Sequence, residues 1–234
     1  HCSNMRYGIL LFTLCLWAAE PGIDRAKLQH IGPRMQGYVD QNLLSGVVTL
    51  VAHKGEIVHL NAVGRQTVED NRKMANDSIF QIMSMTKPVT GVAVMMLVEE
   101  GRMNLTDPVE RHLPEFRGQM VRDAEGKLRK PARLVTIRDL MTHTSGMAGM
   151  PPASTPELYQ KMDLPLADAV RIFAQQPLEF DPGTRWLYSN PGIATLGRLV
   201  EIHSGLPFEK FLEQRIFAPL GMKDSHIFLP AEKQ

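Results

Sequence analysis

The stretch SMTKPVTGVAVMMLVEEGRMNLTDPVERHLPEF, residues 84–116, decides the fold prediction for this chain. Its apolar residues recur at the three- and four-residue spacing of one helix face, at Val89, Val92, Ala93, Met96 and Leu97. Pro88 fits only the first turn of a helix, because a later proline would remove a helical hydrogen bond. Gly101 indicates a C-terminal cap. We therefore predict a helix that begins within residues 84–87 and ends at Gly101.

The same stretch begins with a serine and a lysine three positions apart, Ser84 and Lys87. Side chains at this spacing are neighbours on a helix surface, with Cβ atoms about 5–6 Å apart. A serine hydroxyl becomes a good nucleophile when a nearby base takes its proton, and an uncharged lysine amine can be that base. The helix N-terminus adds partial positive charge beside the developing alkoxide. Because an apolar helix follows, we expect Lys87 to face packed protein. A helix cap with a solvated lysine is the usual alternative for such a pair taken alone.

Upstream of this helix, the runs 47–53 and 57–63 are rich in β-branched residues and flank Lys54-Gly55-Glu56. This pattern predicts a β-hairpin. Two strands alone form a marginal sheet. The hairpin is therefore expected to need further strands as partners.

Downstream, the segment 117–133 is polar and predicts a surface loop or small excursion. Thr136 and Asp139 have the spacing of a capping box for a short helix over 137–142. Further helices are predicted over 164–175 and 191–203, the second entered through a proline.

A second polar cluster, Tyr188-Ser189-Asn190, lies between an Asp-Pro-Gly turn at 181–183 and the helix that starts at Pro191. A tyrosine beside a lysine can share proton transfer, and an asparagine amide can both donate to and accept from a substrate amide. A half-buried tyrosine that only packs is the alternative for Tyr188.

The N-terminal residues predict a secretory signal peptide over residues 5–19. Met5 and Arg6 precede a short apolar run that ends in Ala18-Ala19. A buried N-terminal helix is the alternative. The two cysteines, Cys2 and Cys15, both fall within or before this leader. The mature chain would therefore have no disulfide framework, thiol nucleophile or cysteine-based zinc site, and we expect an exported protein, periplasmic or extracellular.

The composition argues against several classes of function. With 26 basic and 25 acidic residues, the chain has no electrostatic case for binding nucleic acid. No segment approaches the length of a stable membrane span.

The eight histidines make no metal-binding pattern. His143, in Thr-His-Thr-Ser-Gly, is favoured as a structural residue at a helix end. No phosphate-binding glycine loop and no Gly-x-Ser-x-Gly elbow occurs, so neither a cofactor nor a metal is expected. The sequence carries no signal for an oligomeric state.

Three motif-bearing stretches then occur in a familiar order: residues 84–116 quoted above, LVTIRDLMTHTSGM at 134–147, and DPGTRWLYSNPGIATLGRLVE at 181–201. Together they resemble the serine β-lactamase-related family of class C β-lactamases, D-alanyl-D-alanine carboxypeptidases, esterases and D-aminopeptidases. The resemblance extends from about residue 46 to the C-terminus, and Ser-x-x-Lys is a signature of related enzymes.

The resemblance implies an α+β fold of the β-lactamase/transpeptidase type, an antiparallel sheet flanked by helices. It predicts one hydrolase domain over 20–234 with a helical subdomain at roughly 100–205. Carried over residue by residue, it implies Ser84 as nucleophile, Lys87 as its base, Tyr188 as a proton-transfer partner and Asn190 as a substrate-binding residue. The implied activity is acyl transfer to water from a small-molecule or peptidoglycan-like substrate: a small ester, a D-amino-acid peptide or a β-lactam.

The chain departs from the family pattern in one respect. The family's third motif, Lys-Thr-Gly or His-x-Gly on a later strand, does not follow Asn190. In the family that strand supplies one of two backbone donors of the oxyanion hole, and losing one donor costs about 10²–10³ in rate. We therefore interpret the chain as an N-terminal fragment that lacks the C-terminal strands of the sheet. A catalytically weak or silent binding module is the alternative function.

Overall fold

The computed structural model describes residues 22–69, 71–153 and 164–233, so the predicted signal peptide at 5–19 lies outside the described residues. The chain divides into two compact units, residues 1–80 and 81–234. In the three described ranges, no helix combines the length and apolar character needed to cross a bilayer.

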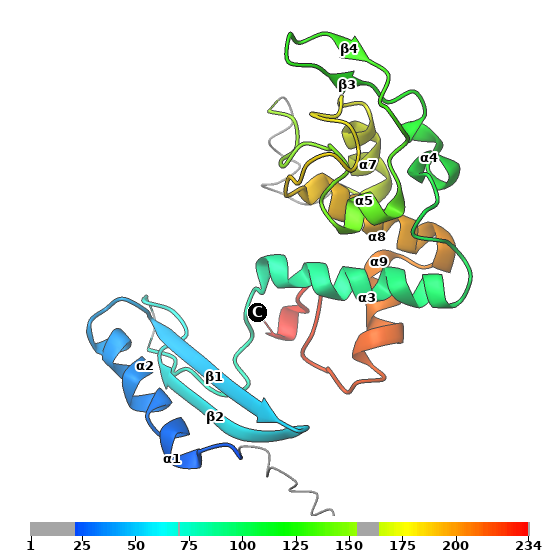
Figure 1. Cartoon of the computed structure of the whole chain (residues 1–234). Helices are drawn as coiled ribbons and strands as arrows, with labels where there is room; N and C mark the ends of the chain where they lie inside the picture. The colour runs from blue at the N-terminus through cyan, green and yellow to red at the C-terminus, as the bar shows by residue number, and fades with distance from the viewer. Residues whose placement is uncertain (1–21, 70, 154–163, 234) are drawn as a thin grey trace, which may run out of the picture. The chain divides into compact units, whose positions relative to one another are not determined.

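The first unit holds the predicted hairpin, which is confirmed. Strands β1 (Gly46–His53) and β2 (Glu56–Gly64) pair antiparallel, with a bulge between Val51 and Ala52. Helix α2 (Ile31–Asp40) follows the short α1 (Arg25–Leu28) and packs along both strands (Figure 1). The described part of this sheet has only these two strands, and large apolar side chains remain exposed on it.

Two glycines allow the ends of the hairpin to approach closely. Gly46 faces Gly64 in the register. A Cβ atom on Gly46 would lie 2.3 Å from the Arg65 carbonyl oxygen, and one on Gly64 would lie 2.4 Å from that of Ser45. Gly64 also has a positive φ of 82°, which other residues adopt only with strain. Larger residues at either position would force these strand ends apart.

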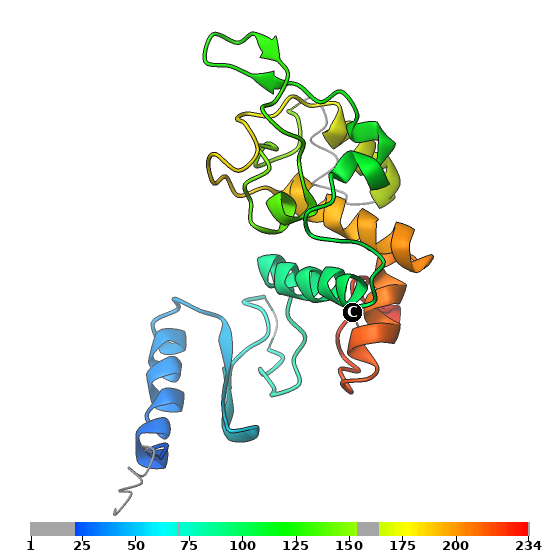
Figure 2. The same cartoon turned by 45° about the vertical axis from the view of Figure 1, so that its right-hand side comes forward.

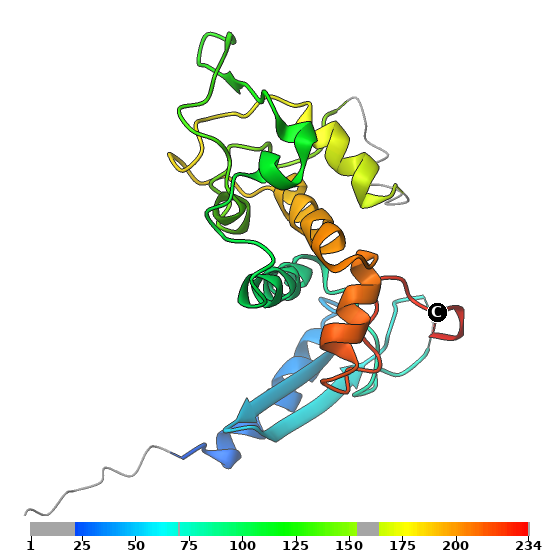
Figure 3. The ribbon, with the colours of Figure 1, turned by 90° about the vertical axis from the view of Figure 1, so that its right-hand side faces the viewer.

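The second unit is mostly helical. The helices among its described residues are α3 (Thr86–Glu99), α4 (Val109–His112), α5 (Ile137–Met141), α7 (Leu166–Ala174), α8 (Asn190–Ser204) and α9 (Phe208–Leu212). Single 3₁₀ turns lie at Met83–Met85, Pro114–Phe116 and Ala231–Lys233, and a π-helical turn lies at Glu213–Phe217. Helix α8 is central to the unit, because it packs against α3, α5, α7 and α9 (Figures 2 and 3).

The apolar core of this unit holds α3 against α8. Both helices contribute side chains that are fully or almost fully buried: Ala93, Val94 and Leu97 from α3, and Leu196, Leu199 and Val200 from α8. A fully buried leucine or valine stabilises the fold by about 1.5–3 kcal/mol relative to an exposed one. The packing therefore fixes the N-terminal ends of α3 and α8, which carry the predicted site residues.

The predicted boundaries of α3 are confirmed. The helix begins at Thr86, so Pro88 is its third residue, where no backbone N–H is required. The chain leaves the helix at Gly101 with a φ of 70°. The predicted excursion at 117–133 contains a small hairpin, β3 (Val121–Arg122) and β4 (Leu128–Arg129).

The predicted capping box of α5 is also confirmed, and an arginine completes it. The Thr136 hydroxyl accepts from the Asp139 N–H, while the Asp139 carboxylate accepts from the Thr136 N–H and hydroxyl. Arg133 donates to both carboxylate oxygens, at 2.6 and 2.8 Å. Burial alone would raise the pKa of Asp139, but these hydrogen bonds together hold the pKa below its ordinary value. The charged carboxylate thus anchors the segment that leads to His143.

Candidate active site

The structure brings three of the sequence-predicted site residues together. The Ser84 Oγ accepts a hydrogen bond of 2.7 Å from the Tyr188 hydroxyl and one of 3.2 Å from the Lys87 Nζ. The Lys87 Nζ also lies 4.7 Å from the centre of the Tyr188 ring. One hydroxyl, one amine and one phenol therefore form a single contact group, although Tyr188 is 104 positions away from Ser84 in the sequence.

Ser84 stands just before the N-terminus of α3, within the 3₁₀ turn that leads into it. The preceding residue, Met83, has a φ of 49°, in the left-handed region that non-glycine residues rarely adopt. Such strain, on the order of 1–3 kcal/mol, is found most often where a site requires a particular backbone geometry. The turn leaves Ser84 exposed and able to meet a substrate, while Lys87 one helical turn later is half-buried.

Tyr188 is held by the residue that follows it. Ser189 caps α8, because its hydroxyl accepts from the Gly192 N–H at 3.0 Å and donates to the Ala148 carbonyl at 2.8 Å. Its own N–H donates to the Nδ1 of His143 at 3.1 Å. With all these groups engaged and its side chain buried, Ser189 ties the start of α8 to the segment around His143.

His143 is the residue of this site that the sequence analysis did not assign to it. Its ring stacks on the Tyr188 ring, with centroids 4.7 Å apart and planes inclined by 27°. Trp186 meets the other aromatic rings at 6.0 Å from His143 and 6.4 Å from Tyr188. We predicted that His143 is a structural residue at a helix end, but its side chain contacts the tyrosine segment rather than capping α5. The only sequence signal was its position just after a capped helix.

The electrostatics of the group favour proton transfer at the phenol. Hydrogen bonding by Lys87, and then by Ser84, lowers the pKa of Tyr188 below its ordinary value. Burial, with a smaller effect from the charge of Lys87, lowers the pKa of His143. His143 is therefore neutral near pH 7, and its Nδ1 can accept from the Ser189 N–H only in that neutral form.

Asn190, the fourth predicted site residue, is the first residue of α8. Its side-chain amide donates to the Gly149 carbonyl at 3.4 Å and lies 3.6 Å from the Met150 sulfur. Its backbone N–H donates to the same Gly149 carbonyl. The side-chain amide of Asn190 thus holds the 149–150 loop in place. A substrate that binds this amide would have to replace its contacts with the loop.

Within the described ranges, no group of three or more histidine, cysteine, aspartate or glutamate side chains gathers as a metal site would require. The geometry of the contact group suits one kind of chemistry, removal of a proton from the Ser84 hydroxyl. The phenol oxygen and the amine nitrogen both lie within hydrogen-bond reach of this hydroxyl, and either can take its proton once it has itself been deprotonated.

The comparison with protein families gives a match over most of the chain. Residues 31–234 match the family model described as Beta-lactamase. Esterase EstB of Burkholderia gladioli is 35% identical over 225 residues, which cover 91% of this chain and 54% of EstB. The chain spans about half the length of the curated relatives it matches.

Comparison with solved structures gives matches to proteins with similar folds. EstCE1, a hydrolase with promiscuous acyltransferase activity, is 28% identical and superposes with a TM-score of 0.70, covering 84% of this chain and 51% of EstCE1. A class C β-lactamase has the same TM-score at 22% identity, covering 91% of this chain and 54% of its own. This second likeness concerns the fold alone.

Proposed function

Because this chain belongs to the β-lactamase family, we propose that it is a serine hydrolase that transfers acyl groups through Ser84. The family and the α+β, β-lactamase/transpeptidase-like fold predicted from the motifs are both confirmed. The observation that carries the proposed activity is the contact of the Ser84 Oγ with two groups able to take its proton, the Tyr188 phenol and the Lys87 amine.

The proposed reaction has two steps. Lys87 and Tyr188, acting as one base, take the Ser84 proton, and the Oγ forms a bond to the substrate carbonyl carbon. The bond to the leaving alcohol or amine then breaks, and the leaving group receives that proton. Water, deprotonated by the same base, attacks the acyl-enzyme, and the acid is released as the Ser84 hydroxyl re-forms. The N-terminus of α3 favours negative charge at Ser84 by about 0.3–1 kcal/mol. This is a small share of any rate enhancement.

We favour a small carboxylic ester as the substrate. EstB, named an esterase, is more similar to this chain than the relatives named penicillin-binding protein 4* and β-lactamase, at 27% and 26% identity. An exposed Ser84 also suits a small, freely diffusing molecule. A D-amino-acid peptide and a β-lactam are the other candidates. We assign substrate binding to Asn190, whose side-chain amide would first have to break its hydrogen bond to the Gly149 carbonyl. The proposed place of action is outside the cytoplasm.

The test is to trap the covalent intermediate. The chain would be incubated with a nitrophenyl ester of a short acid and with a fluorescent penicillin, quenched in acid and digested. We expect an acyl adduct on the peptide that contains Ser84, and a burst of nitrophenol equal to the amount of protein. An adduct on a different serine, or turnover with no adduct and no burst, would contradict the proposal.

The same experiment decides between an enzyme and a binding module. A module that binds without acylation would protect the chain against unfolding in the presence of substrate but would leave the Ser84 peptide unmodified. Slow labelling without turnover would indicate a catalytically weak chain.

His143 is expected to position Tyr188 for this reaction. Replacing it with alanine removes the stacked ring and the acceptor for the Ser189 N–H, so the phenol loses its fixed distance to Ser84. A displacement of about 1 Å at a reacting group can cost about 10²-fold in rate. We expect His143→Ala to lower kcat by about 10- to 100-fold with little change in KM, measured with the ester.

A conservative variant and the pH profile separate positioning from general damage. His143→Asn keeps an acceptor and tolerates the left-handed φ of 59°, so it should recover part of the lost kcat. Acid protonates His143, which turns Nδ1 into a donor facing another donor. Wild-type activity should therefore fall as the pH drops below the ordinary histidine pKa of about 6.5, since the pKa of His143 is lowered. If the activity of His143→Asn falls below a pH of about 6.5 as steeply as that of the wild type, His143 is not the source of the additional fall.

A further inference from the structure

The stretch 129–133 begins at the last residue of β4 and carries two arginines, each of which holds an aspartate of another segment. Arg129 donates to both carboxylate oxygens of Asp181, at 3.0 and 2.5 Å. Arg133 holds both oxygens of Asp139 in the same way. Two-bond contacts between a guanidinium and a carboxylate fix the orientation of the two groups as well as their distance. We call the stretch 129–133, with its two arginine–aspartate pairs, the brace.

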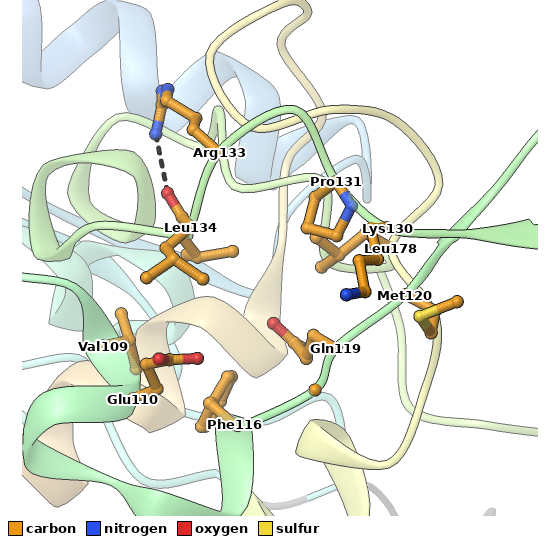
Figure 4. A pocket seen from close by; sticks show the side chains of 12 residues that line it. Val109, Glu110, Phe116, Gln119, Met120, Lys130, Pro131, Arg133, Leu134 and Leu178 are labelled. Carbon is orange, nitrogen blue, oxygen red and sulfur yellow. Dashed lines mark hydrogen bonds between the residues drawn. The ribbon is translucent and has the colours of Figure 1, made fainter.

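Packing alone does not fix the brace. Its residues are exposed except for the half-buried Pro131, and it borders a pocket of about 340 Å³ rather than filled core (Figure 4). Figure 4 also shows the hydrogen bond from Arg133 to the Leu134 carbonyl, which is 3.0 Å long. A further contact lies at the other end, where the Ala132 N–H donates to the Oδ1 of Asp181 at 2.8 Å. The brace is therefore held mainly through the two aspartates.

Asp181 is the first residue of the tyrosine segment, residues 181–188. The turn after Asp181 is closed by Thr184, whose N–H and hydroxyl both donate to the Asp181 carbonyl. Within this turn Gly183 has a φ of 83° and lies against the second arginine of the brace. A Cβ atom on Gly183 would lie 2.3 Å from the Nη2 of Arg133. The tyrosine segment therefore contacts both arginines of the brace before it reaches Tyr188.

The other aspartate of the brace, Asp139, holds the segment that carries His143. Its carboxylate accepts from the Thr144 hydroxyl at 3.1 Å, and its carbonyl accepts from the Thr144 N–H at 2.9 Å. Two backbone hydrogen bonds then join this segment to the tyrosine segment. The Gly183 N–H donates to the Thr144 carbonyl at 2.8 Å, and the Leu187 N–H donates to the His143 carbonyl at 2.9 Å. The brace thus fixes both segments whose aromatic rings stack beside the candidate nucleophile.

We propose that Asp181 is a positioning residue for the Tyr188 phenol, and that its pairing with Arg129 sets where the tyrosine segment lies relative to Ser84. This inference rests on the proposed function, in which the phenol takes part in proton transfer. Without the carboxylate, the tyrosine segment keeps its backbone hydrogen bonds but is no longer tied to the brace. The Tyr188 hydroxyl then loses its fixed distance of 2.7 Å to the Ser84 Oγ. Hydrogen bonds from Arg129 and the Ala132 N–H lower the pKa of Asp181 to about 2, so it acts as a fixed charge and not as a base.

The first test measures the ionisation of the phenol and needs no substrate. Ultraviolet absorbance titrates the tyrosines, and subtracting the matched Tyr188→Phe chain isolates Tyr188. Hydrogen bonds with Lys87 and Ser84 lower the Tyr188 pKa, so a displaced phenol should have a higher pKa, closer to the ordinary value of about 10. We expect this rise in Asp181→Ala, and a smaller rise in Asp181→Asn, which can still accept from the Ala132 N–H.

The direction of the shift distinguishes displacement from a direct effect of charge. Removing a negative charge favours the phenolate and would by itself lower the Tyr188 pKa. A rise therefore reports that the phenol has moved away from its partners. A Tyr188 pKa in Asp181→Ala that is equal to or below that of the wild type would overturn the proposal.

The second test measures turnover of the nitrophenyl ester. A displacement of about 1 Å can cost about 10²-fold in rate, and the remaining backbone hydrogen bonds limit the movement. We therefore expect Asp181→Ala and Arg129→Ala each to lower kcat by about 5- to 20-fold, with little change in KM. Because both variants remove the same pair, the double variant should be slower than the worse single variant by no more than about twofold. Single losses that multiply in the double variant would show that the pair does not act as one contact.

Asp123→Ala is the matched control. The Asp123 carboxylate accepts from the N–H groups of Glu125 and Lys127 within the β3–β4 hairpin, so this variant loses comparable hydrogen bonds away from the tyrosine segment. It should leave kcat and the Tyr188 pKa unchanged, and a loss as large as that of Asp181→Ala would refute the specific role of the brace. A wild-type chain without turnover would contradict the proposed hydrolase, whereas the phenol titration would still decide whether Asp181 positions Tyr188.

Discussion

Replacing Ser84 with alanine is expected to abolish hydrolysis and covalent labelling. In the proposed reaction the Ser84 hydroxyl forms the acyl bond and then releases it, so its loss removes both steps. Removal of the nucleophile in serine hydrolases costs on the order of 10⁶-fold in kcat, and we expect a fall of at least about 10⁴-fold here. The measurement is steady-state turnover of the nitrophenyl ester, together with the mass of the Ser84 peptide.

The Ser84→Ala variant should remain folded, because the side chain is exposed and packs in no core. Exposed substitutions of this kind usually change stability by no more than about 0.5 kcal/mol, which urea denaturation would verify. Ser225→Ala removes another hydroxyl of the same unit and should leave turnover intact. A Ser84→Ala chain that retains a tenth or more of the activity would show that water attacks without an acyl-enzyme, and the nucleophile would have to be reassigned.

The sequence predicted the local elements of this chain well because their signals are local. The helix over 86–99 follows from apolar spacing and Pro88, and the capping box at Thr136 follows from a three-residue spacing. The hairpin follows from β-branched runs around a glycine turn. Each of these signals lies within about a dozen residues, where propensity and hydrogen bonding act directly.

Such local signals could not predict the site contacts between residues that are far apart in the sequence. Nothing in the spacing of Tyr188 places its hydroxyl 2.7 Å from the Ser84 Oγ. That contact depends on the burial of α3 against α8, and the motif resemblance, rather than periodicity, indicated it. For the same reason His143 was not assigned to the site, since its partners lie more than 40 positions away in sequence. The hydrogen bonds of Asn190 to the 149–150 loop were likewise not predictable from its position beside Tyr188.

Lys87 and Tyr188 are expected to act as one unit, so removing both should cost little more than removing either. Lys87→Met deletes the amine, and Tyr188→Phe deletes the phenol while keeping the ring against His143. General base catalysis contributes about 10²–10⁴-fold, and each single variant should lose kcat within that range. Two independent groups would multiply their effects, whereas residues of one catalytic unit are strongly non-additive. The double variant should therefore be slower than the worse single variant by less than about tenfold.

The pH profile gives the same hypothesis a second test. Hydrogen bonding by Lys87 and Ser84 lowers the pKa of Tyr188, so the deprotonated, basic form of the phenol is populated at lower pH than in free tyrosine. The wild-type rate should therefore rise with pH and reach its plateau below the ordinary tyrosine pKa of about 10. Lys87→Met removes the larger of the two effects, and the residual activity should rise only at higher pH. Two results would contradict the hypothesis that Lys87 and Tyr188 act as one base. The first is a Lys87→Met rate that rises over the same pH range as the wild-type rate. The second is a double variant whose loss of kcat equals the product of the two single losses.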